Sequence, residues 1–174
     1  MLSNLWLLAL TIGLLIVASA FFSSSETALT AASDARMRQL ANKGNKRARI
    51  VEKLRADREG LIGSILIGNN AVNVLGSALA TSFAIALFGE GGLFWATIGM
   101  TVLLVVFAEV MPKTYAFTYA DSYALRIAPV LQLVVRALSP LSVGIRLLAN
   151  QIIRQNPDAN ENREEELRGL IELQ

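Results

Sequence analysis

Three long segments of this chain carry no charged side chain. They cover residues 2–25, 61–89 and 91–108, and each reaches the roughly 17–25 residues that an α-helix needs to cross a bilayer core. In lipid, such a segment satisfies its backbone hydrogen bonds only as a helix or in a closed barrel. We therefore expect an all-α polytopic membrane protein with three transmembrane helices, at about residues 2–25, 61–88 and 92–111.

The basic residues predict how these helices are oriented. Lys and Arg together number 16, and none lies in the first segment or in the Gly-rich turn at residues 88–92. Because Lys and Arg collect in cytoplasmic loops, we expect the N-terminus and this turn outside and the C-terminus inside. The basic residues lie in two groups, which are Arg36, Arg38, Lys43, Lys46, Arg47, Arg49, Lys53, Arg55 and Arg58, and then Lys113, Arg126, Arg136, Arg146, Arg154, Arg163 and Arg168.

The first segment has a second interpretation. Ala18-Ser19-Ala20 resembles the cleavage site of a secretory signal peptide, which follows a short apolar stretch. However, no Lys or Arg precedes this stretch, and Phe21 and Phe22 prolong it. These features favour a membrane span, with cleavage as the alternative.

The cytoplasmic loop at residues 33–59 mixes its basic residues with apolar ones such as Met37, Val51 and Leu54. This pattern predicts a basic amphipathic helix on the inner membrane surface, where anionic lipid attracts it. Nucleic-acid binding is the alternative that a basic run leaves open, and we expect no nucleic-acid partner.

Residues 115–153 are apolar but are interrupted by three Arg residues and by Pro129 and Pro140. No uncharged run is long enough to span a bilayer on its own. We expect short juxtamembrane helices on the cytoplasmic side, with a tilted fourth span as the alternative. Residues 1–154 then form one transmembrane domain. Residues 155–174 begin with a polar linker and are expected to lead into a cytosolic domain.

Oxygen-bearing side chains lie inside the apolar segments. Ser19 and Ser23 are four residues apart, as are Asn69 and Asn73, so each pair lies on one face of its helix. At about 1.5 Å per residue, both pairs and Glu109 fall in the inner half of the bilayer. Polar groups at this depth usually face an ion or substrate pathway. Because the chain has no His and no Cys, its donors are oxygens, which suit Mg²⁺, Na⁺ or Ca²⁺.

Further residues adjoin this set, and each has a structural alternative. Asn70 follows Asn69, Glu26 lies one turn on the cytoplasmic side of Ser23, and Lys113 is four residues from Glu109. Pro112 has no N–H for the carbonyl of Ala108, which leaves that carbonyl as a backbone ligand. The alternatives are serines bonded to their own helix, asparagines that join helices, and a structural Glu109–Lys113 pair.

Three motifs together resemble the transmembrane domain of the CorC/cyclin M family. Residues 19–29 read SAFFSSSETAL, residues 66–73 read LIGNNAVN, and residues 109–113 read EVMPK. The resemblance covers residues 2–153. It departs at Ala108, where the family commonly has Gly, and this leaves the identity of the carbonyl ligand open.

The resemblance implies a homodimer in the lipid membrane of a prokaryotic cell, with a cytosolic pair of CBS modules after the transmembrane domain. Nucleotide binding would belong to those modules, so no ATP site is expected in this chain. The family is associated with magnesium efflux, which implies export of Mg²⁺ in exchange for Na⁺ through an inward-facing cavity. The implied ligands are Ser19, Ser23, Asn69, Asn73 and Glu109, with a carbonyl near Pro112.

Two other function classes remain as alternatives. A Mg²⁺-sensing membrane scaffold would bind the ion without transporting it. An intramembrane enzyme would need a nucleophile and a base, and a Ser with Lys113 is the one conceivable pair, so we expect no enzymatic activity.

Overall fold

The computed structural model describes residues 2–153, and this part of the chain is helical with no strand. The helices are α1 (Leu2–Ala31), α2 (Asp34–Asn42), α3 (Lys46–Ala56), α4 (Arg58–Phe88), η1 (Gly89–Gly91), α5 (Gly92–Val102), η2 (Leu103–Val110), α6 (Met111–Thr118) and α7 (Ala120–Ile153). The expected linker and cytosolic segment at residues 155–174 lie outside the described residues. Residues up to Ser139 form one compact unit, and those from Pro140 onward form a second.

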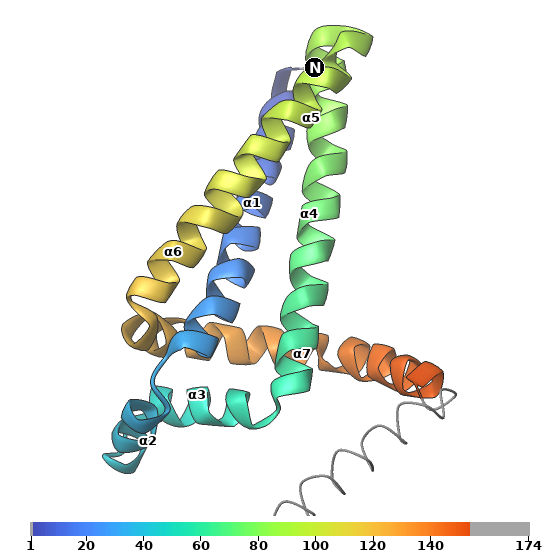
Figure 1. Ribbon diagram of the computed structural model, residues 1–174. Helices are drawn as coiled ribbons and strands as arrows, with labels where there is room; N and C mark the ends of the chain where they lie inside the picture. The colour runs from blue at the N-terminus through green and yellow to red at the C-terminus, as the bar shows by residue number, and fades with distance from the viewer. Residues whose placement is uncertain (1, 154–174) are drawn as a thin grey trace, which may run out of the picture. The chain divides into compact units, whose positions relative to one another are not determined.

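Three long helical rods make up most of the first unit (Figure 1), namely α1, α4 and the continuous helix from α5 to α6. The beginning of α1, the end of α4 and the beginning of α5 lie together, and α2 and α3 lie at the other end. Large apolar side chains such as Trp6, Leu10 and Val74 are exposed along the rods. Lipid-facing surfaces have this character, whereas a soluble monomer rarely exposes so much apolar area.

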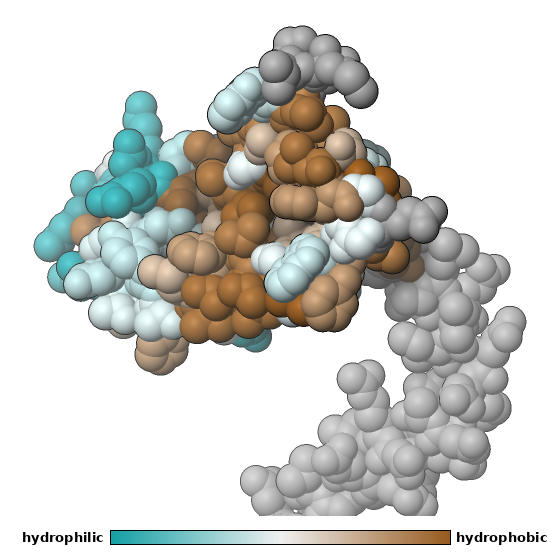
Figure 2. All heavy atoms as spheres, turned by 90° about the horizontal axis from the view of Figure 1, so that it is seen from above, coloured by the Kyte–Doolittle hydropathy of each residue, from teal (hydrophilic) through white to brown (hydrophobic). Residues whose placement is uncertain are grey.

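Viewed down the rods, hydrophobic side chains cover the long helices, and hydrophilic side chains gather on the side where α2 lies (Figure 2). Glycines bring the rods close together. A Cβ on Gly92 would collide with the backbone of Ala84, and a Cβ on Gly76 would lie 3.3 Å from Met100 Cε. The turn between α4 and α5 uses Gly89 at a φ of 67°, a left-handed conformation that favours glycine.

Four described helices are long and apolar enough to cross a membrane, at Leu5–Ala31, Arg58–Phe88, Gly92–Thr118 and Ala120–Ile145. The second and third contain the predicted spans 61–88 and 92–111, and the first overlaps the predicted span 2–25 but begins later and ends later. The fourth lies in the region for which we expected juxtamembrane helices. Several membrane spans are therefore supported by length and composition, and the number three stays a prediction.

The basic loop at residues 33–59 is helical, as expected, but it forms two helices, α2 and α3, where the pattern predicted one, and its last residues begin α4. Ser33 and Asn45 cap the two helices by accepting hydrogen bonds from backbone N–H groups, which is the usual role of Ser and Asn at this position. Met37 and Val51 are fully buried, in a core shared with Leu29 of α1. The basic side chains are thus carried on helices that pack against the end of α1.

The third rod differs from the prediction that Pro112 interrupts it. The helix continues through Pro112 to Thr118, and the irregularity lies just before the proline, where residues Leu103–Val110 form a π-helix. The N–H of Met111 bonds the carbonyl of Val106, five residues back. Pro112 lies in the first turn of α6. The wider π register absorbs the missing hydrogen bond, so the proline does not end the helix.

The region after Thr118 also differs from the short broken helices that we expected. The chain bends at Tyr119, and α7 then continues through Pro129 and Pro140. Burial of its apolar face accounts for continuity at the first proline, since Ala124, Ala128 and Leu131 are fully buried. Tertiary packing of this kind outweighs local helix propensity.

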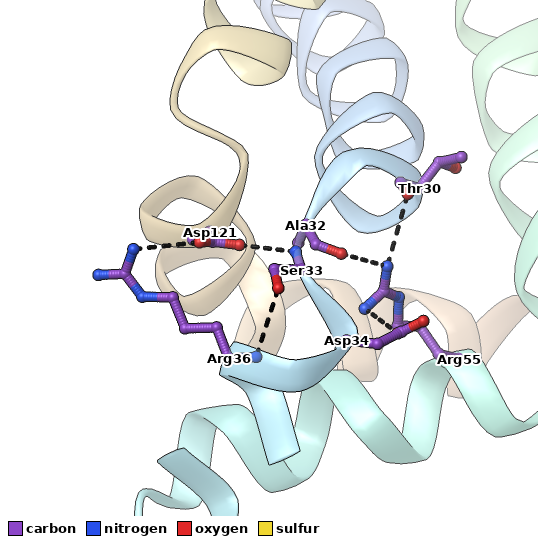
Figure 3. A network of polar contacts seen from close by, with 7 residues as sticks. All are labelled: Thr30, Ala32, Ser33, Asp34, Arg36, Arg55 and Asp121. Carbon is purple, nitrogen blue, oxygen red and sulfur yellow. Dashed lines mark hydrogen bonds and ion pairs between the residues drawn. The ribbon is translucent and has the colours of Figure 1, made fainter. Parts of the chain in front are cut away.

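A network of polar contacts joins the end of α1 to α2, α3 and α7 (Figure 3). Arg55 of α3 donates to the carbonyl of Ala32 at 2.7 Å and to the carboxylate of Asp34 at 2.7 Å. Asp121 of α7 accepts from the N–H of Ser33 at 2.8 Å and from Arg36 at 3.2 Å. These bonds satisfy backbone groups that the end of a helix leaves without partners.

Candidate metal centre

The predicted oxygen-bearing faces of α1 and α4 meet at Ser19 and Asn69. Ser19 is fully buried, and its hydroxyl donates a hydrogen bond to Asn69 Oδ1 at 3.0 Å. The two residues are 50 positions apart in the sequence, so this contact depends on the packing of the two helices. It places the first members of the two predicted pairs side by side.

The second members of the pairs, Ser23 and Asn73, hold buried oxygens without hydrogen bonds. Ser23 Oγ and Asn73 Oδ1 are the buried side-chain polar atoms that find no partner among the described residues. Leaving such a group unsatisfied costs about 1–3 kcal/mol, so each instance calls for a specific explanation. Lone pairs aimed at a cation supply one, because hard cations bind amide and hydroxyl oxygens.

The neighbouring serines behave differently. Ser24 Oγ donates to the carbonyl of Ala20 at 2.6 Å, and Ser25 Oγ donates to that of Phe21 at 2.6 Å. This is the structural alternative for a serine in a membrane helix. It applies to Ser24 and Ser25 but not to Ser19 or Ser23, the two serines that the sequence singled out.

Glu109 lies in the π-helical segment η2, which packs against α1. Its side chain is half-buried, and Lys113 is exposed. No ion pair joins Glu109 to Lys113 in the described part of the chain, so the structural alternative of such a pair is not realised. Among the described residues, Glu109 is therefore a carboxylate on the third rod that no ion pair neutralises.

The π register changes which carbonyl is released near Pro112. The N–H of Met111 bonds the carbonyl of Val106. Because Pro112 has no N–H, the carbonyl of Phe107 lacks a donor if Pro112 follows the π register, and the carbonyl of Ala108 lacks one if Pro112 follows the α register. Ala108 is fully buried. The backbone ligand remains a prediction, with Ala108 and its neighbour Phe107 as candidates.

Asn70 and Glu26, which the sequence also placed near the site, take no part in the contact between α1 and α4 at Ser19 and Asn69. Asn70 is exposed, as expected for a residue turned about 100° around the helix from Asn69. Glu26 is exposed and lines a cavity of about 270 Å³ between the ends of α1, α3 and α4. The cavity is also lined by Leu29, Thr30, Asp34, Arg55, Arg58, Leu61, Ile62 and Ile65.

Some features of the site lie beyond what the sequence indicated. The ring of Phe22 packs where a Cβ on Gly68 would lie, and the hydroxyl of Tyr123 lies 2.8 Å from that of Ser24. The signal for the first was a stripe of small residues along α4, since small residues at such spacing mark close helix approach; the stripe consists of Gly68, Gly76, Ala80 and Ala84. No cluster of three or more carboxylates occurs among the described residues, so a metal here would depend on neutral oxygens and one carboxylate.

Comparison with known proteins identifies similar sequences. The Cyclin M transmembrane N-terminal domain matches residues 10–174. The UPF0053 inner membrane protein YfjD of Escherichia coli is 45% identical over 106 residues, which are 61% of this chain and 25% of that protein. A UPF0053 protein of Haemophilus influenzae is 38% identical over 126 residues, 72% of this chain and 30% of its own length.

A third relative has a functional name. The polyamine export protein of Haemophilus influenzae is 30% identical over 167 residues, which cover 88% of this chain and 39% of that protein. The chain thus spans between 25% and 39% of the length of these relatives.

Proposed function

Because this chain belongs to the family of the Cyclin M transmembrane N-terminal domain, we propose that it exports Mg²⁺ from the cytoplasm in exchange for Na⁺. The ion would pass through an inward-facing cavity to a dehydrated site between α1, α4 and η2. The proposed ligands are Ser19, Ser23, Asn69, Asn73 and Glu109, with one carbonyl before Pro112.

One observation carries this proposal most directly. Ser23 Oγ and Asn73 Oδ1 are buried without hydrogen-bond partners. Each lies one helical turn from a residue of the Ser19–Asn69 hydrogen bond. A buried oxygen without a partner is destabilising, and coordination to a cation would satisfy such an atom. The atoms come from two of the helices that the sequence predicts to share a site.

The chemistry of the ligand set favours Mg²⁺. Mg²⁺ binds oxygen in an octahedral shell and gives up its waters reluctantly, so a site that removes them must offer nearly six oxygens. The proposed set supplies about that number. Glu109 is its one carboxylate, so the bound ion keeps a net positive charge, which suits release. Na⁺ could use the same oxygens at a lower dehydration cost, which suits exchange.

The cavity beside Glu26 supports a cytoplasmic route to this site. Glu26 lies one helical turn below Ser23, and the cavity of about 270 Å³ combines its carboxylate with that of Asp34. Asp34 is paired with Arg55, and Arg58 also lines the cavity, so Glu26 is the one carboxylate there that could contact a hydrated cation. We propose that this cavity is the inner entrance.

We also propose the finer topology that the sequence predicts, with three crossings, an external N-terminus and an internal C-terminus, in the cell membrane of a prokaryote. The basic helices α2 and α3 support it, since they lie at one end of the rods (Figure 1). The part of α7 up to Ser139 runs across α1, as an interfacial helix does. A homodimer is proposed from the family resemblance.

A polyamine is the rival cargo, because one relative is named a polyamine export protein. A polyamine carries several ammonium groups along an extended chain and is best held by several spaced carboxylates. Within the described parts of the three rods, Glu109 is the carboxylate at the depth of the ligand set, with Glu26 nearer the cytoplasm. The small oxygen-rich site therefore fits a single metal ion better.

The test is an ion-flux assay on the purified chain in liposomes. Mg²⁺ should leave the compartment facing α2 and α3 when a Na⁺ gradient is imposed, and Glu109→Ala and Asn73→Ala should abolish the flux. Ser25→Ala, which removes a hydroxyl bonded to its own helix, should transport normally. Full Mg²⁺ flux in both ligand variants would overturn the site. Flux of spermidine instead of Mg²⁺ would overturn the cargo.

The second candidate is a Mg²⁺ sensor that binds the ion without moving it. The orphaned oxygens support binding as well as they support transport. A sensor would be stabilised by Mg²⁺ in a thermal melt through Ser23 and Asn73, yet would show no flux under any Na⁺ gradient.

A further inference from the structure

The connection between α2 and α3 carries an uninterrupted run of positive charge. Residues 35–51 contain six basic side chains and no acidic one. Two of the six are engaged within the fold, since Arg36 pairs with Asp121 and Arg49 Nε donates to the carbonyl of Ala41. The remaining four are exposed and form no ion pair in the described part of the chain, namely Arg38, Lys43, Lys46 and Arg47. The last three lie within five residues, and we call them the basic turn.

The basic turn has a defined backbone. Gly44 has a φ of 90°, a left-handed conformation that favours glycine. Asn45 Oδ1 accepts hydrogen bonds from the N–H groups of Arg47 at 2.9 Å and Ala48 at 3.2 Å, and so caps α3. The three basic side chains are therefore carried on an ordered structure.

The placement of these charges does not stabilise the fold. The first turn of α3 contains Lys46 and Arg47 and no acidic residue. The N-terminus of a helix carries a partial positive charge, so cations are unfavourable there. A sequence that departs from such a local rule often does so at a functional site. An anion from outside the described chain would compensate these charges.

The hairpin of α2 and α3 offers this anion charge and no apolar surface. Met37 and Val51 are fully buried, Leu54 is buried, and no large apolar side chain of the two helices is exposed. The amphipathic pattern of the sequence suggested a helix whose apolar face lies in lipid. That face is instead used for packing on the protein, so the hairpin can meet a membrane only through its charges.

Aromatic side chains indicate where the membrane surface lies. Trp6 and Trp95 are exposed where α1 and α5 begin, and Tyr115 and Tyr119 are exposed near the other end of the third rod. Trp and Tyr collect at the two membrane–water interfaces. Trp95 and Tyr115 are 20 residues apart, which is about 30 Å along a helix and matches the thickness of the bilayer core. The two tyrosines therefore mark one headgroup layer.

Polar contacts join the start of α2 to this layer. Asp121, two residues after Tyr119, accepts from the N–H of Ser33 at 2.8 Å and from Arg36 at 3.2 Å (Figure 3). The nine residues of α2 extend about 14 Å at most from that point. A headgroup layer is about 5–7 Å thick, and its surface potential extends about 8–10 Å further. The basic turn is thus within reach of the headgroup charge.

We propose that the basic turn binds the phosphate groups of anionic phospholipids in the leaflet on this side of the membrane. Lys ammonium and Arg guanidinium groups donate charge-assisted hydrogen bonds to phosphate oxygens. Lipid is favoured over nucleic acid or a soluble phosphate, because the turn is tethered beside the membrane and meets headgroups at a high effective concentration. The proposal goes beyond ion transport and does not depend on the identity of the cargo.

The experiment uses the purified full chain in a non-ionic detergent. Phosphatidylglycerol is titrated as the anionic probe and phosphatidylcholine as the neutral one, and bound lipid is counted by native mass spectrometry alongside thermal melts. The test variant combines Lys43→Gln, Lys46→Gln and Arg47→Gln. The matched control combines Lys43→Arg, Lys46→Arg and Arg47→Lys, which changes the same positions and keeps every charge.

We expect the wild-type chain to bind phosphatidylglycerol more tightly than phosphatidylcholine, with the difference decreasing as salt is added. Each basic residue near an anionic surface contributes about fivefold in affinity, so the glutamine variant should bind phosphatidylglycerol about a hundredfold more weakly. The charge-preserving control should bind as wild type does. Without lipid the glutamine variant should melt at the wild-type temperature or above it, since cations leave the first turn of α3.

Two soluble anions test the choice of lipid. Glycerol phosphate carries the headgroup chemistry without acyl chains, and a short RNA duplex carries phosphates in another class of molecule. Both should bind much more weakly than phosphatidylglycerol. If either binds the basic turn as tightly as phosphatidylglycerol does, the partner is a soluble anion and the lipid assignment is wrong.

The remaining outcomes separate this inference from the proposed function. The glutamine variant should keep the wild-type melting shift with Mg²⁺, because no proposed ligand is changed. Equal phosphatidylglycerol binding by wild type and the glutamine variant would overturn the lipid contact and leave the metal site intact. Loss of lipid binding in the variant, together with no Mg²⁺ flux in wild type, would support the lipid contact and overturn transport.

Discussion

The hydroxyl of Tyr123 on α7 lies 2.8 Å from the hydroxyl of Ser24 on α1. Ser24 is the residue after Ser23, whose own hydroxyl is buried without a partner. The bond thus ties α7 to α1 within one residue of a proposed ligand.

Tyr123→Phe tests this link, because it removes the hydroxyl and keeps the ring. We expect a loss of about 1 kcal/mol in the free energy of unfolding, the usual size of one hydrogen bond. We also expect weaker stabilisation by Mg²⁺, since α1 is held less firmly. Both are measured by thermal melts with and without Mg²⁺.

Tyr119→Phe is the control for this prediction. Tyr119 packs its ring on Tyr115, and its side chain is largely exposed. It should show neither effect. Equal Mg²⁺ responses in wild type and Tyr123→Phe would mean that α7 contributes packing alone.

Ser23→Ala separates stability from ion binding. Removing a buried hydroxyl that has no partner eliminates an unfavourable desolvation term, so without Mg²⁺ the variant should be as stable as wild type, or more stable by about 1 kcal/mol. With Mg²⁺ it should gain little further stability. This opposite response is typical of functional sites that are kept at a cost to stability.

Ser25→Ala is matched to Ser23→Ala in helix, depth and chemical change. Its hydroxyl bonds the carbonyl of Phe21, so its removal should leave the Mg²⁺ response unchanged. Differential scanning fluorimetry across a Mg²⁺ titration measures both variants. If Ser23→Ala keeps the full Mg²⁺ shift, Ser23 is not a ligand.

Arg55→Lys should destabilise the cytoplasmic end of α1. The Arg55 guanidinium bonds Asp34 Oδ1 and the Ala32 carbonyl at 2.7 Å each, and a lysine ammonium cannot reproduce this fork. We expect a loss of about 1–2 kcal/mol in unfolding free energy, mainly from the carbonyl contact. Asp34 is 76% exposed, so Asp34→Ala should cost much less.

Chemical denaturation in detergent measures these free energies. Arg47→Lys serves as the control, since Arg47 is an exposed arginine of the same helix. A larger loss in Asp34→Ala than in Arg55→Lys would show that the ion pair, and not the capping of α1, dominates.

The sequence was sufficient to predict contacts that follow from helical spacing. Ser19 and Asn69 could be placed on facing helices because each belongs to a pair spaced four residues apart, and the structure joins them. Ser23 and Asn73 follow from the same spacing. Met37 and Val51 could be expected on the buried faces of basic helices for a similar reason, and both are buried.

Other features depend on tertiary packing and were not predictable in this way. The contact of Phe22 with Gly68 requires the crossing point of two helices, which periodicity does not contain. The continuation of α7 through Pro129 depends on burial of Ala124 and Ala128 against other helices. The π register around Glu109 changes the turn by one residue, and a proline motif alone does not distinguish it from a kink.

Pro112→Ala examines whether the π-helical segment supplies a ligand. The new N–H can bond the carbonyl that Pro112 leaves free, either that of Phe107 or that of Ala108, and it permits the ordinary α register. We expect unchanged or greater thermal stability without Mg²⁺, because proline is the poorest residue in a helix interior. Mg²⁺ stabilisation should decrease, since one oxygen is withdrawn and Glu109 is turned.

Pro129→Ala makes the same chemical change in α7, away from the π-helical segment, and should leave the Mg²⁺ response at the wild-type level. The two variants are compared by Mg²⁺ titration in thermal melts and by liposome flux. If Pro112→Ala binds Mg²⁺ as tightly as wild type, neither the freed carbonyl nor the π register contributes to the site. The ligands would then be the side chains of α1 and α4 with Glu109 alone, and water would have to complete the octahedral shell of Mg²⁺.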